Sequence, residues 1–253
     1  MSFILHSVPT RPVKPRSLGL TMVIDKGLGC NELTDLLEIS GEYIDFIKLG
    51  FGTALISGKL KEKLNLIKSF GVTPYFGGTL FEAFIIRKQF SDFAKYVSQN
   101  NLEMVEVSDG SIELPHDEKL EYIQALSKEF IVLSEVGSKK AEKTFDDQEW
   151  VNQMQEELKA GSWKVIAEAR ESGTIGIYDA KGNPNKKLIT AISEKIKLDD
   201  IIWEAPNKNQ QIMFIKQFGY NVNLGNIAPS EALSLETLRL GLRGDTFFDF
   251  MQE

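Results

Sequence analysis

Eight short β-rich runs recur along this chain of 253 residues, and most of them are followed by a stretch of helical period. The runs read GLTMVIDKG, IDFIKLGFG, TPYFGGT, EMVEVSDG, IVLSEVG, KVIAEAR, IIWEAP and VNLGNI. Strands that alternate with helices build a parallel sheet, and eight such units in about 250 residues are typical of a closed (β/α)8 barrel. The sequence therefore predicts an α/β protein with a single TIM-barrel domain over residues 1–253, in which residues 1–17 form an N-terminal arm.

The boundaries of the expected elements follow from turn residues and from hydrophobic period. We expect strands over residues 18–25, 43–49, 72–76, 103–107, 130–136, 163–169, 201–205 and 221–224. One long helix is expected over residues 81–100, after the third strand. In a barrel of this kind the carboxyl ends of the strands line the active site, so the same pattern predicts an enzyme.

Composition excludes several classes of protein and site. A net charge of −7 argues against nucleic acid and anionic membranes as partners, and no apolar run approaches the about 20 residues of a membrane span. A single cysteine, Cys30, rules out an internal disulfide and favours the reducing cytoplasm. The two histidines, His6 and His116, both lie away from the expected strand ends. A metal would therefore be held by carboxylates, which favours Mg²⁺ or Mn²⁺.

Four glutamates stand where expected strands end: Glu106, Glu135, Glu168 and Glu204. Parallel barrel strands are buried on both faces, and a carboxylate inside such a strand is costly unless a cation compensates it. Two arrangements resolve the repulsion between four converging carboxylates. They ligate a divalent metal ion, or some of them pair with Lys48, Lys139 or Arg170.

Basic residues and glycines cluster at the same expected barrel mouth. The basic side chains at or just past strand ends are Lys26, Lys48, Lys139, Lys140, Arg170 and Lys208, which suggests local recognition of an anion on an acidic protein. The FGGT turn contains Gly77 and Gly78, and the last run contains Asn223, Gly225 and Asn226. Backbone amides in such turns bind phosphate, most often after the last strands of a barrel.

Taken in order, the motifs DKGLG, KLGFGT, GGTLFE, EVSDG, EVG followed by lysines, EARESG, EAPNKNQQ and VNLGNI resemble the phosphosulfolactate synthase family. The resemblance runs from about Lys14 to Gly244. It implies a (β/α)8 barrel that adds sulfite to phosphoenolpyruvate with Mg²⁺, giving (2R)-3-phosphosulfolactate, and hence a carbon–sulfur lyase. The family also includes heat-stress-associated plant proteins, so a barrel without catalysis is one alternative. Another Mg²⁺-dependent lyase or aldolase acting on a small phosphorylated acid is the second.

The residue patterns and the resemblance together predict roles for individual residues. Lys139, Lys48 and Arg170 would be catalytic, and the four glutamates Glu106, Glu135, Glu168 and Glu204 would bind the metal. The residues expected to bind substrate or phosphate are Lys26, Gly77, Gly78, Lys208, Asn223, Gly225 and Asn226. The family often reads EVG directly followed by two lysines, whereas this chain reads EVGSKK, so the proton donor is either Lys139, which we prefer, or Lys140. The sequence is compatible with a homo-oligomer.

Overall fold

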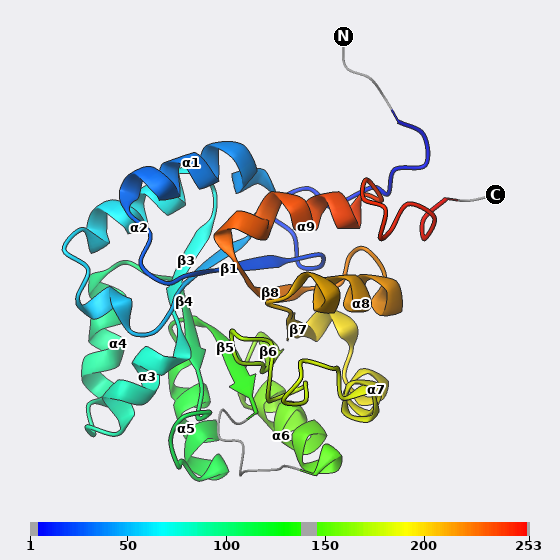
Figure 1. Cartoon of the computed structure of the whole chain (residues 1–253). Coiled ribbons are helices and arrows are strands. Elements are labelled where there is room, and N and C mark those ends of the chain that lie inside the picture. The colour runs from blue at the N-terminus through cyan, green and yellow to red at the C-terminus, as the bar shows by residue number, and fades with distance from the viewer. Residues whose placement is uncertain (1–4, 138–145, 252–253) are drawn as a thin grey trace.

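The computed structural model describes residues 5–137 and 146–251. Its strands form one closed barrel in the order β1 to β8, and every neighbouring pair is parallel (Figure 1). The strands are β1 (Thr21–Asp25), β2 (Phe46–Leu49), β3 (Thr73–Phe76), β4 (Met104–Val107), β5 (Ile131–Val136), β6 (Lys164–Ala167), β7 (Ile201–Glu204) and β8 (Leu224–Ile227). The predicted eight-stranded parallel barrel is confirmed.

Helices surround the outside of the barrel (Figure 1). They are α1 (Cys30–Ser40), α2 (Leu60–Ser69), α3 (Gly78–Ile85), α4 (Phe90–Gln99), α5 (His116–Leu126), α6 (Asp147–Ala160), α7 (Lys186–Lys195), α8 (Lys208–Phe218) and α9 (Ala232–Arg239). Short 3₁₀ helices occur at η1 (Gly41–Tyr43), η2 (Thr53–Leu55), η3 (Leu198–Asp200) and η4 (Pro229–Glu231). In the part of the chain that the structure describes, no helix has both the length and the apolar character needed to cross a membrane.

Alternation along the strands fills the barrel with two layers. The lower layer is an apolar cluster that includes Phe46, Met104, Leu133, Ile166 and Ile202. Two residues further along the same five strands stand the charged residues Lys48, Glu106, Glu135, Glu168 and Glu204. Because side chains two apart on a strand share a face, each charged side chain lies on the inner face, one step closer to the carboxyl end. This period of two is what brings the charges together at the mouth.

The residues between these positions face the helices and form the main hydrophobic core. Val105, Ala167 and Trp203 alternate with the inward residues and are fully buried in this outer cluster. Burial of a large apolar side chain contributes about 1.5–3 kcal/mol each, so this layer supplies most of the favourable free energy of folding. It is therefore the outer layer that holds the strands in place and allows the inner layer to carry charge.

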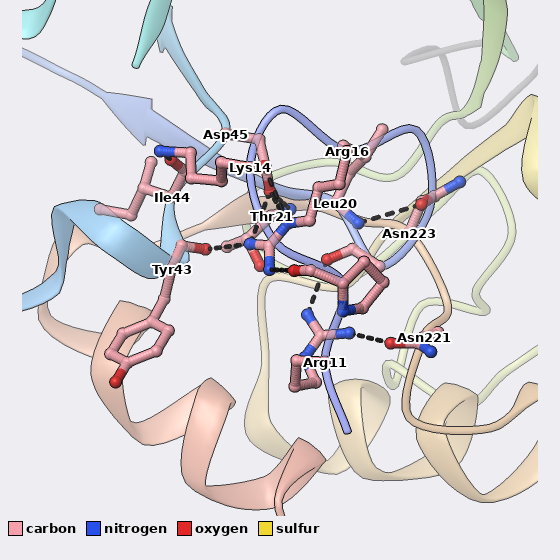
Figure 2. A network of polar contacts seen from close by, with 12 residues as sticks. Arg11, Lys14, Arg16, Leu20, Thr21, Tyr43, Ile44, Asp45, Asn221 and Asn223 are labelled. Atoms are coloured by element: carbon pink, nitrogen blue, oxygen red, sulfur yellow. Dashed lines mark hydrogen bonds and ion pairs between the residues drawn. The ribbon is translucent and has the colours of Figure 1, made fainter. Parts of the chain in front are cut away.

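The N-terminal arm closes the barrel at the amino ends of the strands (Figure 2). Arg16 Nε donates to Asp45 Oδ1 at 2.9 Å, and Asp45 Oδ2 accepts a hydrogen bond from the Thr21 backbone N–H at 2.8 Å. Arg11 Nη2 donates to the Gly19 carbonyl at 2.7 Å, and its Nε pairs with Glu236 at 2.8 Å. The arm thus joins the starts of β1 and β2 to α9 at the end remote from the charged layer.

The predicted elements differ from the structure mainly in one helix and in the starts of three strands. The strands expected from residues 18 and 43 begin at Thr21 and Phe46, three residues later. The helix expected over residues 81–100 is two helices, α3 and α4. Lys88, at φ 57°, takes the left-handed conformation that glycine usually supplies after a helix, so the sequence carries no visible sign of the break. The last strand lies at residues 224–227, three residues later than expected at its start.

Candidate active site

A cavity of about 470 Å³ opens at the carboxyl ends of the strands. The predicted site residues among those that line it are Lys48, Gly77, Glu135, Arg170, Glu204 and Asn226. Phe51, Thr79, Ser111, Glu171 and Ser172 also line it, and the sequence analysis did not single them out. Thr79 lies in the first turn of α3 and the other four lie in loops that follow strands, so only the folded chain shows that they face the cavity.

Lys48 is the centre of the charged layer. Its Nζ lies 2.8 Å from Glu106 Oε1, 3.1 Å from Glu135 Oε2 and 3.5 Å from Glu204 Oε1. These carboxylates come from β4, β5 and β7, while Lys48 comes from β2, so the pairs cross the inside of the barrel. The lysine is only 7% exposed. Of the two arrangements that the sequence left open, the structure thus shows pairing with Lys48 for three of the four glutamates.

The Glu106 carboxylate is outside the cavity lining and is fixed from three sides. Besides Lys48, it accepts a hydrogen bond from the Tyr75 hydroxyl at 3.0 Å and one from the Gly78 backbone N–H at 2.6 Å. Burial raises the pKa of Glu106, and Lys48 opposes that rise. Tyr75 is a further inward residue of β3, and burial together with Glu106 raises its pKa well above the ordinary value. Tyr75 therefore acts as a neutral donor that holds Glu106.

The pKa values of Lys48 and Glu204 shift in the same direction for different reasons. Burial alone would lower the pKa of Lys48, but Glu106, Glu135 and Glu204 outweigh burial and raise it well above the ordinary value. Burial raises the pKa of Glu204 to about 8, although Lys48 and the hydrogen bond from the Ala169 N–H at 2.7 Å oppose the rise. Lys48 is thus a permanent ammonium, while Glu204 can hold a proton near neutral pH.

Formal charges in this cluster do not balance. One ammonium, Lys48, faces three carboxylates, which leaves a formal charge of −2 when all are ionised. Within residues 5–137 and 146–251, no three or more histidine, cysteine or acidic side chains already stand in an arrangement that would hold a metal ion. The excess of carboxylate oxygen is nevertheless a hard-donor environment that attracts protons or a hard cation.

A family model described as (2R)-phospho-3-sulfolactate synthase (ComA) matches residues 9–245. The chain belongs to this family. A phosphosulfolactate synthase from Bacillus subtilis (strain 168) is 43% identical over 244 residues, which cover 95% of this chain and 97% of the relative. A phosphosulfolactate synthase from Methanothermobacter thermautotrophicus is 44% identical over 244 residues, which cover 94% and 95%. The predicted family is confirmed, and with it the prediction of an enzyme.

Solved structures with little sequence identity share the fold of this phosphosulfolactate synthase family member. A crystal structure of 3-hexulose-6-phosphate synthase superposes with a TM-score of 0.56 at 16% identity, covering 87% of this chain and 99% of that chain. At this identity the likeness concerns the barrel architecture alone.

Glu168 and Arg170 stand at the end of β6 in this phosphosulfolactate synthase family barrel. The Glu168 side chain is buried, whereas Arg170 is exposed and lines the cavity. Gly110 and Gly137 pack against Glu168 so closely that a Cβ at Gly110 would lie 2.8 Å from Glu168 Oε2. The loop after β4 and the end of β5 therefore close over this carboxylate, and a side chain at Gly110 would displace it.

The glycine pair after β3 serves packing as well as the cavity. A Cβ on Gly77 would lie 3.0 Å from Lys48 Cε, and a Cβ on Gly78 would overlap the Ser108 hydroxyl and approach Glu106 Oε1 to 2.9 Å. The Gly78 amide is already used by Glu106. Close approach to Lys48 and Glu106 thus explains why both positions are glycine, and the amide of Gly78 is not directed at a phosphate.

Besides Gly78, four predicted substrate-binding residues do not line the cavity. Asn223 lies at the opposite end of the barrel, where its Nδ2 donates to the carbonyls of Asp199 and Ile201 and its Oδ1 accepts from the Leu20 N–H (Figure 2). Gly225 lies inside the barrel against Met22 and Ile202. Lys208 pairs with Asp245 at 2.8 Å with 41% of its side chain exposed, and Lys26 is exposed outside the cavity lining.

Lys139 and Lys140 lie outside the described residues.

Asn226 is the one predicted residue of the last run that lines the cavity, and its Nδ2 donates to the Ala169 carbonyl at 3.3 Å. Its Oδ1 is buried and has no hydrogen-bond partner among the described residues. Asn226 therefore presents an unused oxygen acceptor at the site.

Sequence reasoning also missed a second buried ion network behind β5. Lys119 of α5 is fully buried, and its Nζ lies 2.8 Å from Asp109 Oδ1, 2.7 Å from Glu157 Oε1 and 2.7 Å from the Glu135 carbonyl oxygen. It thus ties the loop after β4 and helix α6 to the strand residue that carries a cavity carboxylate. A lysine near the start of a helix gives no sign of this role, because its partners lie on other elements of the fold.

Proposed function

We propose that this protein adds sulfite to phosphoenolpyruvate and forms phosphosulfolactate. The observation that carries the proposal is the family match over residues 9–245, supported by relatives 43% and 44% identical along nearly the whole chain. The reaction gathers phosphate, carboxylate and sulfite in one pocket, and the cavity lining supports the proposal because it offers the cations Lys48 and Arg170.

The chemistry has two steps whose atoms balance. The sulfur lone pair of sulfite attacks C3 of phosphoenolpyruvate and forms the carbon–sulfur bond, while the electrons of the double bond move into the carboxylate. A proton then adds to C2, and the phosphate stays on its oxygen. The intermediate carries an extra negative charge on the carboxylate. Groups that stabilise this charge lower the free energy of the intermediate and so speed the reaction.

The protein side chains divide this work between charge and proton transfer. Lys48 stays charged because its pKa is raised well above the ordinary value by the glutamates that outweigh its burial, so it stabilises negative charge and does not act as the acid. A residue whose pKa lies closer to the working pH is needed to give the proton, and we assign that step to Lys139. Arg170 contacts an anionic group of the substrate from the rim of the cavity.

The donor set of the site fits Mg²⁺. Carboxylate and amide oxygens are the ligands that this ion prefers, and the buried Asn226 oxygen lacks a partner within the described chain. We propose that Mg²⁺ is held from the set Glu106, Glu135, Glu168 and Glu204, of which Glu135 and Glu204 line the cavity together with Asn226. When bound, the ion would supply positive charge between the substrate carboxylate and the carboxylates that surround Lys48.

The test is an assay of the purified protein with phosphoenolpyruvate, sulfite and Mg²⁺, followed by phosphorus NMR. We expect a new phosphate ester that forms only when both substrates are present. Consumption of phosphoenolpyruvate without sulfite would instead favour another lyase or aldolase. If the folded protein consumes neither substrate, the alternative of a barrel without catalysis, as in the stress-associated plant relatives, replaces this proposal.

A further inference from the structure

The loop between β6 and α7 brings three neighbouring residues to the cavity. Arg170, Glu171 and Ser172 follow β6 and line the cavity together. Their positions depend on how residues 170–185, here called the β6–α7 loop, are held. A loop of this length has many conformations, so a defined position needs specific contacts.

Part of the β6–α7 loop is fixed by backbone contacts and by β7. The Gly173 N–H donates to the Arg170 carbonyl at 2.7 Å, and the Ile177 N–H donates to the Glu168 carbonyl at 3.0 Å. The buried Tyr178 hydroxyl donates to the Glu204 carbonyl at 2.8 Å. These bonds hold the turn at residues 170–173 and the backbone at residues 177–178, and the carbonyl oxygens of Ser172 and Gly173 accept hydrogen bonds from α8.

Two side chains at the start of α8 bind those carbonyls. Asn207 Nδ2 donates to the Ser172 carbonyl at 3.1 Å, and Gln210 Nε2 donates to the Gly173 carbonyl at 2.8 Å and to the Gly182 carbonyl at 3.4 Å. Gln210 is only 3% exposed, so its amide is committed to these partners. The two amides thus bind the loop at two places. The first is Ser172 and Gly173, just after Arg170, and the second is Gly182, nine residues after Gly173.

The loop sequence matches this contact. Gly173 has a φ of +73°, and a Cβ there would overlap Asn207 Nδ2 and approach the Gln210 amide. Only glycine therefore allows the loop to come this close to α8. The side chains of Asn207 and Gln210 are neutral amides, so they hold the loop without neutralising the charge of Arg170.

We propose that Asn207 and Gln210 are positioning residues, which hold the β6–α7 loop so that Arg170 and Ser172 face the cavity. Asn207 and Gln210 belong to the EAPNKNQQ motif, and this role explains their place in it. The lysine of the motif, Lys208, pairs with Asp245 and not with the cavity. Its kinetic consequence depends on the proposed function, whereas its structural part does not.

The two amides also cap α8, and this allows the loop-holding role to be separated from helix stability. The Asn207 side chain accepts from the Gln210 backbone N–H, and Gln210 Oε1 accepts from the Asn207 N–H at 3.1 Å. Gln210→Glu and Asn207→Asp keep these acceptor oxygens, lose the N–H donors to the loop and each add one negative charge, as the control below also does. Asn185→Asp is the matched control, because Asn185 caps α7 at the other end of the same loop through its Oδ1.

The first measurement is amide hydrogen exchange without substrate, with circular dichroism to verify folding. We expect exchange in residues 171–178 to quicken by about tenfold or more in Gln210→Glu and in Asn207→Asp, because a buried carbonyl loses its donor. Asn185→Asp should behave as the wild type. If both test variants, or the one that folds, show wild-type exchange in this segment, the proposal is wrong.

The second measurement is steady-state kinetics with phosphoenolpyruvate and sulfite. We expect kcat/KM to fall by about tenfold or more, mainly through a higher KM, since Arg170 and Ser172 would no longer be held at the cavity. A loosened loop with unchanged kinetics would overturn the positioning role. If the wild type itself is inactive, the proposed function fails, and hydrogen exchange alone still decides whether the amides hold the loop.

Discussion

Replacing Glu204 by glutamine should stabilise the fold at alkaline pH while it harms the site. Burial raises the pKa of Glu204 from 4.5 to about 8. One pH unit of pKa change corresponds to about 1.4 kcal/mol, so ionising Glu204 in the folded protein costs about 4–5 kcal/mol of folding free energy. Glutamine has the same shape and can still accept from the Ala169 N–H, but it cannot ionise.

The sign of the pH dependence follows from the raised pKa. A carboxyl group that binds its proton more tightly in the folded state stabilises the fold fully below its unfolded pKa, near 4.5, and loses this contribution as the pH rises through about 8. The wild type and Glu204→Gln should therefore have similar free energies of unfolding near pH 5. At pH 9 the variant should be the more stable by several kcal/mol, about 3–5.

The assay is urea denaturation followed by circular dichroism between pH 5 and pH 9, in the presence of a chelator and without substrates. Glu129→Gln, at an exposed glutamate, is the matched control and should leave the stability unchanged at every pH. A stability difference between wild type and Glu204→Gln that does not grow with pH would refute the reasoning. So would a wild type that is the more stable protein at pH 9.

Three further predictions concern the proton donor, the metal and the second ion network. Lys139→Ala should lower kcat by about 10²–10⁴-fold in steady-state assays with a smaller change in KM; if Lys140→Ala carries the defect instead, the alignment across Ser138 is off by one residue. Glutamine at a true metal ligand among Glu106, Glu135, Glu168 and Glu204 should raise the Mg²⁺ concentration needed for half-maximal activity, and unchanged metal dependence in all four variants would contradict the metal assignment. Lys119→Met should lower the free energy of unfolding by about 3–5 kcal/mol, because Asp109 and Glu157 stay buried without their cation; a loss no larger than that of the exposed-site control Lys128→Met would contradict it.

The barrel and its charged mouth could be predicted because both depend on local patterns. Each strand is an apolar run with a polar residue near its end, and the period of two places Glu106, Glu135 and Glu204 on the inner face. The sequence could not decide whether these carboxylates meet a metal or a lysine. That choice depends on distances across the barrel between β2, β4, β5 and β7, which no local pattern contains.

Other errors have local physical causes. Asn223 and Asn226 are three residues apart in one run, and the predicted strand starts three residues too early, so the prediction places both at the mouth. Asn223 in fact bonds at the opposite end of the barrel. The charge of Lys208 predicts a role at the site, whereas the neighbouring amides Asn207 and Gln210 make the contacts with the β6–α7 loop.

The most direct test of the central claim follows phosphoenolpyruvate that carries a heavy carbon isotope at C3, incubated with sulfite, Mg²⁺ and the protein in heavy water. The proposed reaction predicts that the labelled carbon becomes bonded to sulfur, that C2 carries one deuterium, and that the phosphate remains on the product. Carbon and phosphorus NMR report all three features in one sample. Labelled pyruvate with free phosphate, or a product without a carbon–sulfur bond, would contradict the account.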